Sequence, residues 1–318
     1  MPNIFTRLNL APKIAFLGIS SVALTAFALV CLSIWQSSIY NQLAQREVDD
    51  LINADLNHIT QSVYNLVYTE NEAVQSHVDT NLNVAHHLLH GAGKTMLAVG
   101  ETVRWNAINQ FTNISEEITL PKFMVGDLWL GQNNDISVET PIVDAVTELV
   151  GETATIFQRI NVQGDMLRVA TTVPTLSGER AIGTYIPAVN PDGKENSVVS
   201  TILKAETYHG RAYVVNSWYL TAYEPIRDNT GTIIGMLYVG VKQEIVAARI
   251  RKVILQEKIG SSGYVYVLGG VGHERGRYII SNNGERDGED VWNTQDSDGN
   301  FVIQDIINKA TTLGDKEL

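Results

Sequence analysis

An uncharged run of apolar residues, Ile14–Trp35, lies near the start of the chain. At about 1.5 Å of rise per residue, a helix of roughly 22 residues crosses the ~30 Å hydrocarbon core of a membrane. Arg7 and Lys13 precede the run, whereas the first charge after it is Arg46. Because positive charge stays on the cytoplasmic side, the pattern predicts a cytoplasmic N-terminus over residues 1–13, a transmembrane helix over residues 14–35 and an outward-facing remainder.

A cleaved signal peptide and a lipoprotein signal are the alternatives for this run. The apolar region of a signal peptide is usually about 7–15 residues long and ends at a site of small residues. This run is longer, and it ends in the bulky residues Ile34 and Trp35. Cys31 follows Val30 rather than a small residue, which disfavours lipidation. The pattern therefore favours an uncleaved helix.

A helical pattern, with apolar residues three and four positions apart, follows the apolar run. Residues 40–90 contain neither proline nor glycine. The spacing predicts one continuous helix face, and a helix of about 50 residues extends ~75 Å. We therefore predict a stalk helix over residues 36–95, ended by Gly91 and Gly93. Its predicted face consists of Leu56, Ile59, Val63, Leu66, Val74, Val78, Leu82, Ala85 and Leu89.

The pattern changes near residue 150, where short runs rich in β-branched and aromatic residues are separated by turn signals such as Pro191–Gly193. Two strands, an irregular crossover and three further strands are predicted, which is the order of a PAS-like module of five antiparallel strands. We assign residues 96–241 to this module. The predicted strands are residues 154–161, 166–173, 210–215, 218–226 and 232–241.

The same order of elements begins again after a helical segment at residues 242–258. The runs YVYVLGG (264–270) and RYIIS (277–281) repeat the strand, turn and strand of the first module. We interpret residues 242–318 as the start of a second PAS-like module, which is incomplete because its last three strands do not appear. The predicted fold class is α+β, and we expect the chain to be a fragment.

Charge and cysteine content exclude several classes of function. The formal net charge is −12, whereas a nucleic-acid-binding face must be basic to neutralise phosphates. The single cysteine, Cys31, can form neither an internal disulfide nor a redox pair, and it cannot build a zinc cluster. We expect no nucleic-acid partner.

Four stretches resemble the tandem Cache sensor region, specifically the Cache 3–Cache 2 fusion of methyl-accepting chemotaxis proteins. They are ETATIFQRINVQGDMLRVATTV, GERAIGTYIPA, YHGRAYVVNSWYLTAYEPI and IIGMLYVGVKQE. The resemblance covers about residues 40–318. It implies a sensory region outside the membrane, a membrane-distal module that holds a small ligand and a second module close to the membrane. The second membrane helix, HAMP linker and signalling hairpin of such receptors have no counterpart here, and similar sensors also head histidine kinases.

Catalytic and metal-binding motifs are weak in this sequence. It contains no G-x-S-x-G, Walker or H-E-x-x-H motif. His86, His87 and His90 share a helix end, but we interpret them as a surface cluster. The acidic run Asp287–Asp290 and the segment Asp296–Asn300 lack the ligand spacing of an EF-hand loop and are interpreted as turns. We expect no enzyme activity, no metal site and no cofactor.

Candidate ligand-binding residues gather in the first module, where arginines occur among aromatic residues. A guanidinium binds a carboxylate through two donors, and tyrosine or tryptophan supplies an apolar wall with one donor. We expect a small organic anion such as a carboxylate, with Arg211 as the first choice of partner and Arg168 as the second. Strand alternation places Trp218 opposite the two later tyrosines, so all of them should not line one pocket. The candidates are Arg168, Tyr185, Tyr208, Arg211, Trp218, Tyr219 and Tyr223, and the alternative for each is an ordinary core position.

The sequence as a whole favours the periplasmic sensory region of a chemoreceptor in the inner membrane, acting as a homodimer. A sensor histidine kinase or other sensor enzyme, with its catalytic part beyond residue 318, is the alternative. A periplasmic binding or scaffold protein held by one helix is a third hypothesis. The downstream sequence would separate the three.

Overall fold

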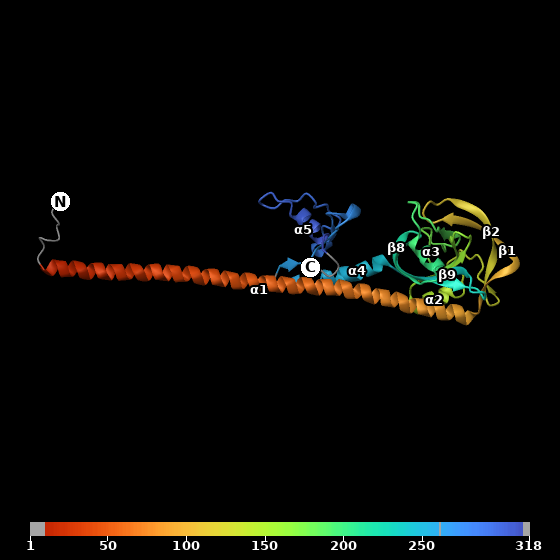
Figure 1. Cartoon of the computed structure of the whole chain (residues 1–318), viewed down its shortest axis with the longest axis horizontal. Coiled ribbons are helices and arrows are strands. Elements are labelled where there is room, and N and C mark those ends of the chain that lie inside the picture. The colour runs from red at the N-terminus through yellow and green to blue at the C-terminus, as the bar shows by residue number, and fades with distance from the viewer. Residues whose placement is uncertain (1–9, 261, 314–318) are drawn as a thin grey trace. The chain divides into compact units, whose positions relative to one another are not determined.

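The computed structural model describes residues 10–260 and 262–313 and divides the chain into two compact units, residues 1–64 and residues 65–317 (Figure 1). One helix, α1 (Leu10–Ala92), runs through both units. The ranges that the sequence separates as membrane segment and stalk are therefore one continuous helix. Arg7 and the side chain of Lys13 lie outside the described residues.

The apolar part of α1 has the properties of a membrane span. Among the described residues, one helix is long and apolar enough to cross a membrane, and its apolar window lies near the N-terminus with no residue buried. Leu24 and Phe27 are among its exposed apolar side chains. The hydroxyls of Ser20, Ser21 and Thr25 donate to backbone carbonyls three or four residues earlier. These polar groups are thus satisfied within the helix, as a membrane requires.

The C-terminal part of α1 belongs to the second unit and packs in its core. Five of the six predicted face positions in this part are buried, which confirms this part of the face: Val74, Val78, Leu82, Ala85 and Leu89. The sixth, Leu66, is half-buried, and Leu56 of the first unit is exposed, so the predicted face is not buried along its whole length. The helix ends at Ala92, as Gly91 and Gly93 predict. Gly93 has φ +135°, and a Cβ there would lie 2.7 Å from the Cα of Gly126. Only glycine allows the chain to reverse here beside the neighbouring loop.

A nine-stranded sheet forms the body of the second unit, with strand order β3-β2-β1-β6-β5-β4-β9-β8-β7. Its pairs are antiparallel except for β1 and β6, which run parallel at Ile108↔Thr184. The strands are β1 (Thr95–Asn109), β2 (Ser115–Val125), β3 (Leu128–Trp129), β4 (Thr153–Arg159), β5 (Met166–Thr171), β6 (Thr184–Ile186), β7 (Tyr208–Val214), β8 (Ser217–Arg227) and β9 (Ile233–Lys242).

Five neighbouring strands, β5-β4-β9-β8-β7, correspond to the five predicted from the sequence, and their boundaries differ from the predicted ones by two residues or fewer. The long β1–β2 hairpin was not predicted. Its register shifts between Leu97 and Thr102. This irregularity breaks the two-residue alternation of buried and exposed positions by which a strand is recognised.

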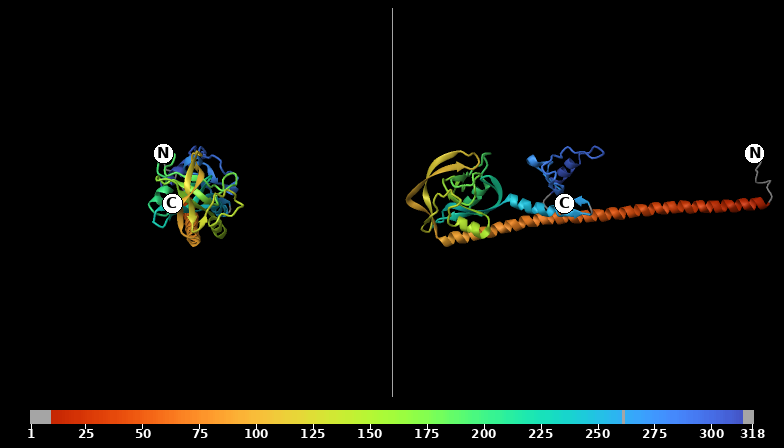
Figure 2. Two further views of the ribbon diagram at one scale, coloured as in Figure 1. Left: turned by 90° about the vertical axis from the view of Figure 1, so that its right-hand side faces the viewer. Right: turned by 180° about the vertical axis from the view of Figure 1, so that it is seen from behind.

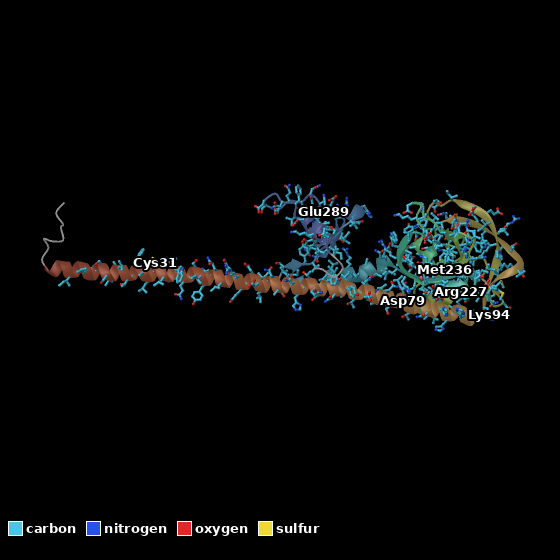
Figure 3. All side chains as sticks on the ribbon, in the orientation of Figure 1. Cys31, Asp79, Lys94, Arg227, Met236 and Glu289 are labelled. Atoms are coloured by element: carbon cyan, nitrogen blue, oxygen red, sulfur yellow. The ribbon has the colours of Figure 1, made fainter. Side chains whose placement is uncertain are left out.

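Helices cover both faces of the sheet. Helix α2 (Val143–Val150) and the end of α1 bury their apolar residues in one cluster, and α3 (Ser197–Leu203) contributes to a second cluster with Tyr219, Tyr223 and Tyr238. Figures 1 and 2 show α2 beside the end of α1, whereas α3 lies among the strands of the domain. Met236 of β9 belongs to the second cluster and lies within the sheet domain in Figure 3.

The C-terminal part of the second unit is built from short elements. Two antiparallel pairs form there, β10 with β11 and β12 with β13, in the register Val267↔Ile280 for the second. This pairing confirms the predicted strand, turn and strand, although the strands are shorter than predicted. The elements are α4 (Gln243–Ile254), β10 (Lys258–Ile259), β11 (Gly263–Tyr264), β12 (Val267–Leu268), two 3-10 helices (Gly272–Glu274 and Asn282–Gly284), β13 (Tyr278–Ile280) and α5 (Val302–Ala310).

Backbone amides in residues 262–313 should exchange with solvent faster than those in residues 150–245. The buried apolar cluster of this C-terminal part has three residues, Val291, Ile303 and Ile307. Local stability follows buried apolar contact, so opening there costs less free energy. Hydrogen exchange followed by mass spectrometry measures the difference. Equal protection in both ranges would contradict the interpretation that the second module is incomplete.

Candidate ligand-binding site

A cavity of about 410 Å³ lies beside β7 and β8, within the size range of small-molecule sites. The loop after β1, the segment between β6 and α3, and strands β7 and β8 supply its walls. Asn196 fixes part of this wall, because its side chain accepts hydrogen bonds from the amides of Val198 and Val199 at the start of α3. The polar lining residues are Gln110, Asn190, Asp192, Asn196, Ser197 and Arg211, and the aromatic ones are Phe111, Tyr213, Trp218 and Tyr223.

Arg168 of β5 lies behind this lining with a side chain that is 0% exposed. Its Nη1 donates to Thr184 Oγ1 at 2.7 Å, and its Nη2 donates to Gln110 Oε1 at 2.9 Å. The guanidinium carbon lies 4.9 Å from the centre of the Phe157 ring. Its Nε–H has no hydrogen-bond partner. Two neutral acceptors and one ring therefore surround a full positive charge.

No carboxylate among the described residues pairs with Arg168. The titratable groups that interact with it are Tyr223, Tyr238 and Tyr219. Burial lowers the pKa of the Arg168 guanidinium, because the charged form is unfavourable in this environment. Arginine nevertheless stays protonated in proteins, so the charge is buried without compensation.

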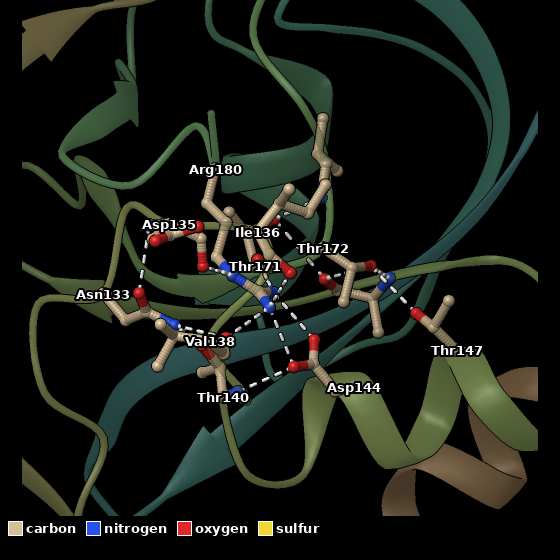
Figure 4. A network of polar contacts seen from close by, with 12 residues as sticks. Asn133, Asp135, Ile136, Val138, Thr140, Asp144, Thr147, Thr171, Thr172 and Arg180 are labelled. Atoms are coloured by element: carbon tan, nitrogen blue, oxygen red, sulfur yellow. Dashed lines mark hydrogen bonds and ion pairs between the residues drawn. The ribbon is translucent and has the colours of Figure 1, made fainter. Parts of the chain in front are cut away.

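Arg180 shows how the same domain compensates a buried guanidinium. It is 3% exposed, and its Nη1 and Nη2 donate to Asp144 Oδ1 and Oδ2 at 2.7 and 2.8 Å. Backbone carbonyls of Asp135, Ile136, Val138 and Thr171 accept its remaining hydrogen bonds. Figure 4 shows this ring of acceptors around Arg180, with Asp144 at the start of α2. Arg180 therefore holds the loop before α2 in place, whereas Arg168 lacks any such partner.

Two buried tyrosines near Arg168 also have unpaired hydroxyls. Tyr219 and Tyr223 are fully buried, and neither hydroxyl has a hydrogen-bond partner. Burial raises the pKa of Tyr219 to about 12 and raises the pKa of Tyr223 as well, so both remain neutral donors at physiological pH. Tyr223 lines the cavity. A buried, unpaired donor on a residue that lines a cavity indicates a place for an acceptor.

Arg211 occupies a different position from Arg168. It is exposed in the middle of β7, and its guanidinium carbon lies 4.0 Å from the centre of the Trp218 ring. Both residues line the cavity. Gly210 has φ +147°, and a Cβ there would lie 3.1 Å from the Tyr208 hydroxyl, so this glycine accommodates the tyrosine ring rather than a turn before the strand.

The structure brings three of the seven candidate residues into one cavity lining: Arg211, Trp218 and Tyr223. Arg168 joins them through Gln110, while Tyr219 lies in the core and outside the lining. Tyr208 and Tyr185 have other partners, since the Tyr208 hydroxyl donates to the Arg211 carbonyl and Asn109 donates to the Tyr185 hydroxyl. Gln110, Asp192 and Asn196 were not predicted. They lie in loops or caps, where no strand alternation marks them.

The histidine cluster and the acidic segments have ordinary contacts. His86 Nδ1 lies 2.7 Å from Glu224 Oε1, and its ring lies 4.2 Å from that of His90. Within the described part of the chain, no group of three or more histidine, cysteine or acidic side chains is placed to hold a metal. Asp296 accepts hydrogen bonds from the amides of Asp298 and Asn300, which makes this segment a turn.

A family model for the Cache 3/Cache 2 fusion domain matches residues 41–317. The chain belongs to this family. Its α+β architecture, with a long helix followed by a mostly antiparallel sheet, is that of the Cache modules that the sequence predicts. The second unit therefore contains a Cache sensory domain, and the cavity beside β7 and β8 lies in it.

Solved structures with some similarity to this Cache chain include the sensory domain of the Campylobacter jejuni chemoreceptor Tlp3 (CcmL) with isoleucine bound. It shares 18% identity at a TM-score of 0.25, and the match covers 37% of this chain and 44% of that one. The ligand-binding domain of Tlp3 in complex with L-valine matches with 16% identity and a TM-score of 0.23, over 35% of this chain and 42% of the other. This chain thus covers less than half of these domains. No curated protein matches it significantly.

Proposed function

We propose that this Cache domain is the extracytoplasmic sensor of a membrane-anchored chemoreceptor and that it binds a small organic carboxylate beside β7 and β8. Sensing, rather than catalysis, is its role. The observation that carries the proposal is the buried Arg168 guanidinium, which has neutral partners and an unpaired Nε–H.

A bound carboxylate would remove the electrostatic cost of this arrangement. An uncompensated buried charge costs several kcal/mol, whereas an ionised acceptor makes hydrogen bonds about twice as strong as a neutral one. The unpaired Tyr223 hydroxyl supplies a further donor at the cavity. Trp218 and Phe111 supply apolar walls, and Arg211 supplies a second positive charge at the lining. The site therefore favours an anion with a small apolar part.

The site is connected to α1 through strand β8. Tyr223 lines the cavity, and the next residue, Glu224, pairs with His86 of α1 at 2.7 Å. A second contact joins His209 of β7 to Asp79 of α1 at 2.8 Å, and Figure 3 marks Asp79 on this helix. A ligand that shifts β7 and β8 therefore acts directly on the helix, and the signal is a shift between two positions of the strands.

A screen of carboxylates tests the proposal. Short-chain, dicarboxylic and α-amino acids are added to the full chain in detergent, each beside its uncharged amide, and the melting temperature is measured. The α-amino acids are included because Asp192 of the lining can pair with an ammonium group. We expect at least one carboxylate to raise the melting temperature while its amide does not. Stabilisation by amides and carboxylates alike would contradict a role for the guanidinium.

A reporter fused after Asp50 should be active outside the cytoplasm, and the chain should remain in the membrane fraction with its N-terminus intact. The reason is the apolar helix with positive charge on its N-terminal side, at Arg7 and Lys13. Reporter activity and N-terminal sequencing measure the two expectations. A cytoplasmic reporter, or cleavage after Ser37, would show that this segment is not a membrane anchor with an outward-facing sensor.

A further inference from the structure

Gln110 lies between the cavity and Arg168. It follows the last residue of β1, lines the cavity and is 8% exposed. Its backbone amide donates to the Tyr185 carbonyl at 3.1 Å, which holds the residue in place at the end of the strand. Because the Gln110 amide is nearly buried, its oxygen and its nitrogen each need a hydrogen-bond partner. The Arg168 guanidinium is beside it and has no counter-ion among the described residues.

Both ends of the Gln110 amide are in use. Its Oε1 accepts from Arg168 Nη2 at 2.9 Å, and its Nε2 donates to the Tyr213 carbonyl of β7 at 3.4 Å. The orientation places the amide oxygen at the guanidinium, where a carboxylate oxygen would bind most strongly. The same side chain therefore links the buried charge to strand β7, which carries Arg211.

We infer that Gln110 is a built-in substitute for the ligand carboxylate: its amide oxygen occupies Arg168 in the unliganded domain, and the ligand must displace it. This inference rests on the proposed function in one respect: the group that displaces Gln110 is the carboxylate of the proposed ligand. A carboxylate replaces the amide because the charge-assisted hydrogen bond is about twice as strong. Displacement also breaks the bond to the Tyr213 carbonyl, so occupancy of the site is transmitted to β7. Gln110 thereby acts as a positioning residue that sets both the affinity and the response.

The test replaces the substitute with a true carboxylate. In the full chain in detergent, Gln110→Glu should raise the melting temperature without ligand by about 2–4 °C or more, because it neutralises Arg168 from within. The gain should vanish when Gln110→Glu is introduced into Arg168→Met, with Arg168→Met alone as the reference. It should also vanish in acid. A carboxyl paired with a guanidinium has a lowered pKa, so its stabilisation is present above the ordinary value of about 4.3 and is lost as the pH falls below it.

Gln158→Glu is the matched control. Gln158 of β4 is 1% exposed, and its amide donates to the Pro121 carbonyl. A carboxylate at this position is buried without a guanidinium, so the melting temperature should fall. If Gln110→Glu lowers the melting temperature as Gln158→Glu does, Gln110 is not a substitute for a carboxylate, whatever the domain binds.

Ligand affinity provides the second readout, with acetate as the probe and acetamide as its uncharged counterpart. Gln110→Glu should weaken acetate binding at least tenfold, and Gln110→Ala, which leaves Arg168 open, should strengthen it. If Gln110→Glu stabilises the domain but no variant binds acetate, the inference about Gln110 stands. The proposed carboxylate ligand is then contradicted. Unchanged acetate affinity in both variants would overturn the displacement step.

Discussion

Replacing Asp144 with alanine should destabilise the sheet domain by about 3–5 kcal/mol, because the change leaves a buried guanidinium without its counter-ion. Arg180 is 3% exposed and makes two hydrogen bonds of 2.7 and 2.8 Å to the Asp144 carboxylate. The carbonyls that surround Arg180 accept hydrogen bonds but carry no net charge. Asp144 also accepts from the Thr140 amide, so the loop before α2 loses a second contact. Urea unfolding of the chain in detergent, followed by tryptophan fluorescence, measures the loss.

Glu117→Ala is the control for this prediction. Glu117 pairs with Arg104 on the surface of the β1–β2 hairpin at 3.6 Å, with both side chains largely exposed. Exposed pairs contribute about 0–1 kcal/mol, so the control should unfold close to the parent. Similar losses for Asp144→Ala and Glu117→Ala would show that Arg180 is not held by its buried carboxylate.

Arg168→Met, in contrast to Asp144→Ala, should stabilise the unliganded domain, by about 1–4 kcal/mol. Methionine fills a similar volume beside Phe157 and needs no counter-ion. The Thr184 hydroxyl keeps a partner after the change, since it donates to the Ala181 carbonyl. The Gln110 amide oxygen loses Arg168, but Gln110 lines the cavity, where water can replace the guanidinium. An arginine whose removal stabilises a fold is retained for another reason, and a ligand is the reason proposed here. Unfolding of this variant at a lower urea concentration than the parent would indicate that Arg168 is a structural residue.

The parts of the fold predicted from sequence are those with a regular pattern. The buried face of α1 repeats every three or four residues through Val74, Val78 and Leu82, and the structure confirms it. Strands β8 and β9 are long, rich in β-branched and aromatic residues, and bounded by turn residues. In such segments local propensity and burial agree, so the pattern alone identifies the element.

Neither the β1–β2 hairpin nor Gln110 carries a regular pattern from which it could be predicted. The bulge between Leu97 and Thr102 interrupts alternation in β1, and Gln110 follows this strand in a loop. Gln110 is defined by what it contacts, Arg168 and Tyr213, which are distant in sequence. A glutamine in a loop carries no signal of such contacts.

The ranking of the two candidate arginines also depended on tertiary structure. The sequence favoured Arg211 because a glycine precedes it, but whether a buried arginine has a counter-ion is settled only by folding. Arg180 finds Asp144 from another segment, and Arg168 finds no carboxylate among the described residues. The structure places Arg211 on the exposed side of the lining, stacked on Trp218. We therefore propose Arg168 as the main anion partner, with Arg211 in a supporting position.

Calorimetric titration of a carboxylate found in the screen tests this account most directly. The carboxylate is titrated into the parent chain, Arg168→Met and Arg211→Ala, all in detergent. Loss of a buried charge partner costs about 2–5 kcal/mol, so Arg168→Met should bind roughly thirty-fold or more weakly than the parent. Arg211→Ala, which removes an exposed charge, should lose much less. Equal affinity of the parent and Arg168→Met for the carboxylate would contradict the central claim that this guanidinium is the ligand's counter-ion.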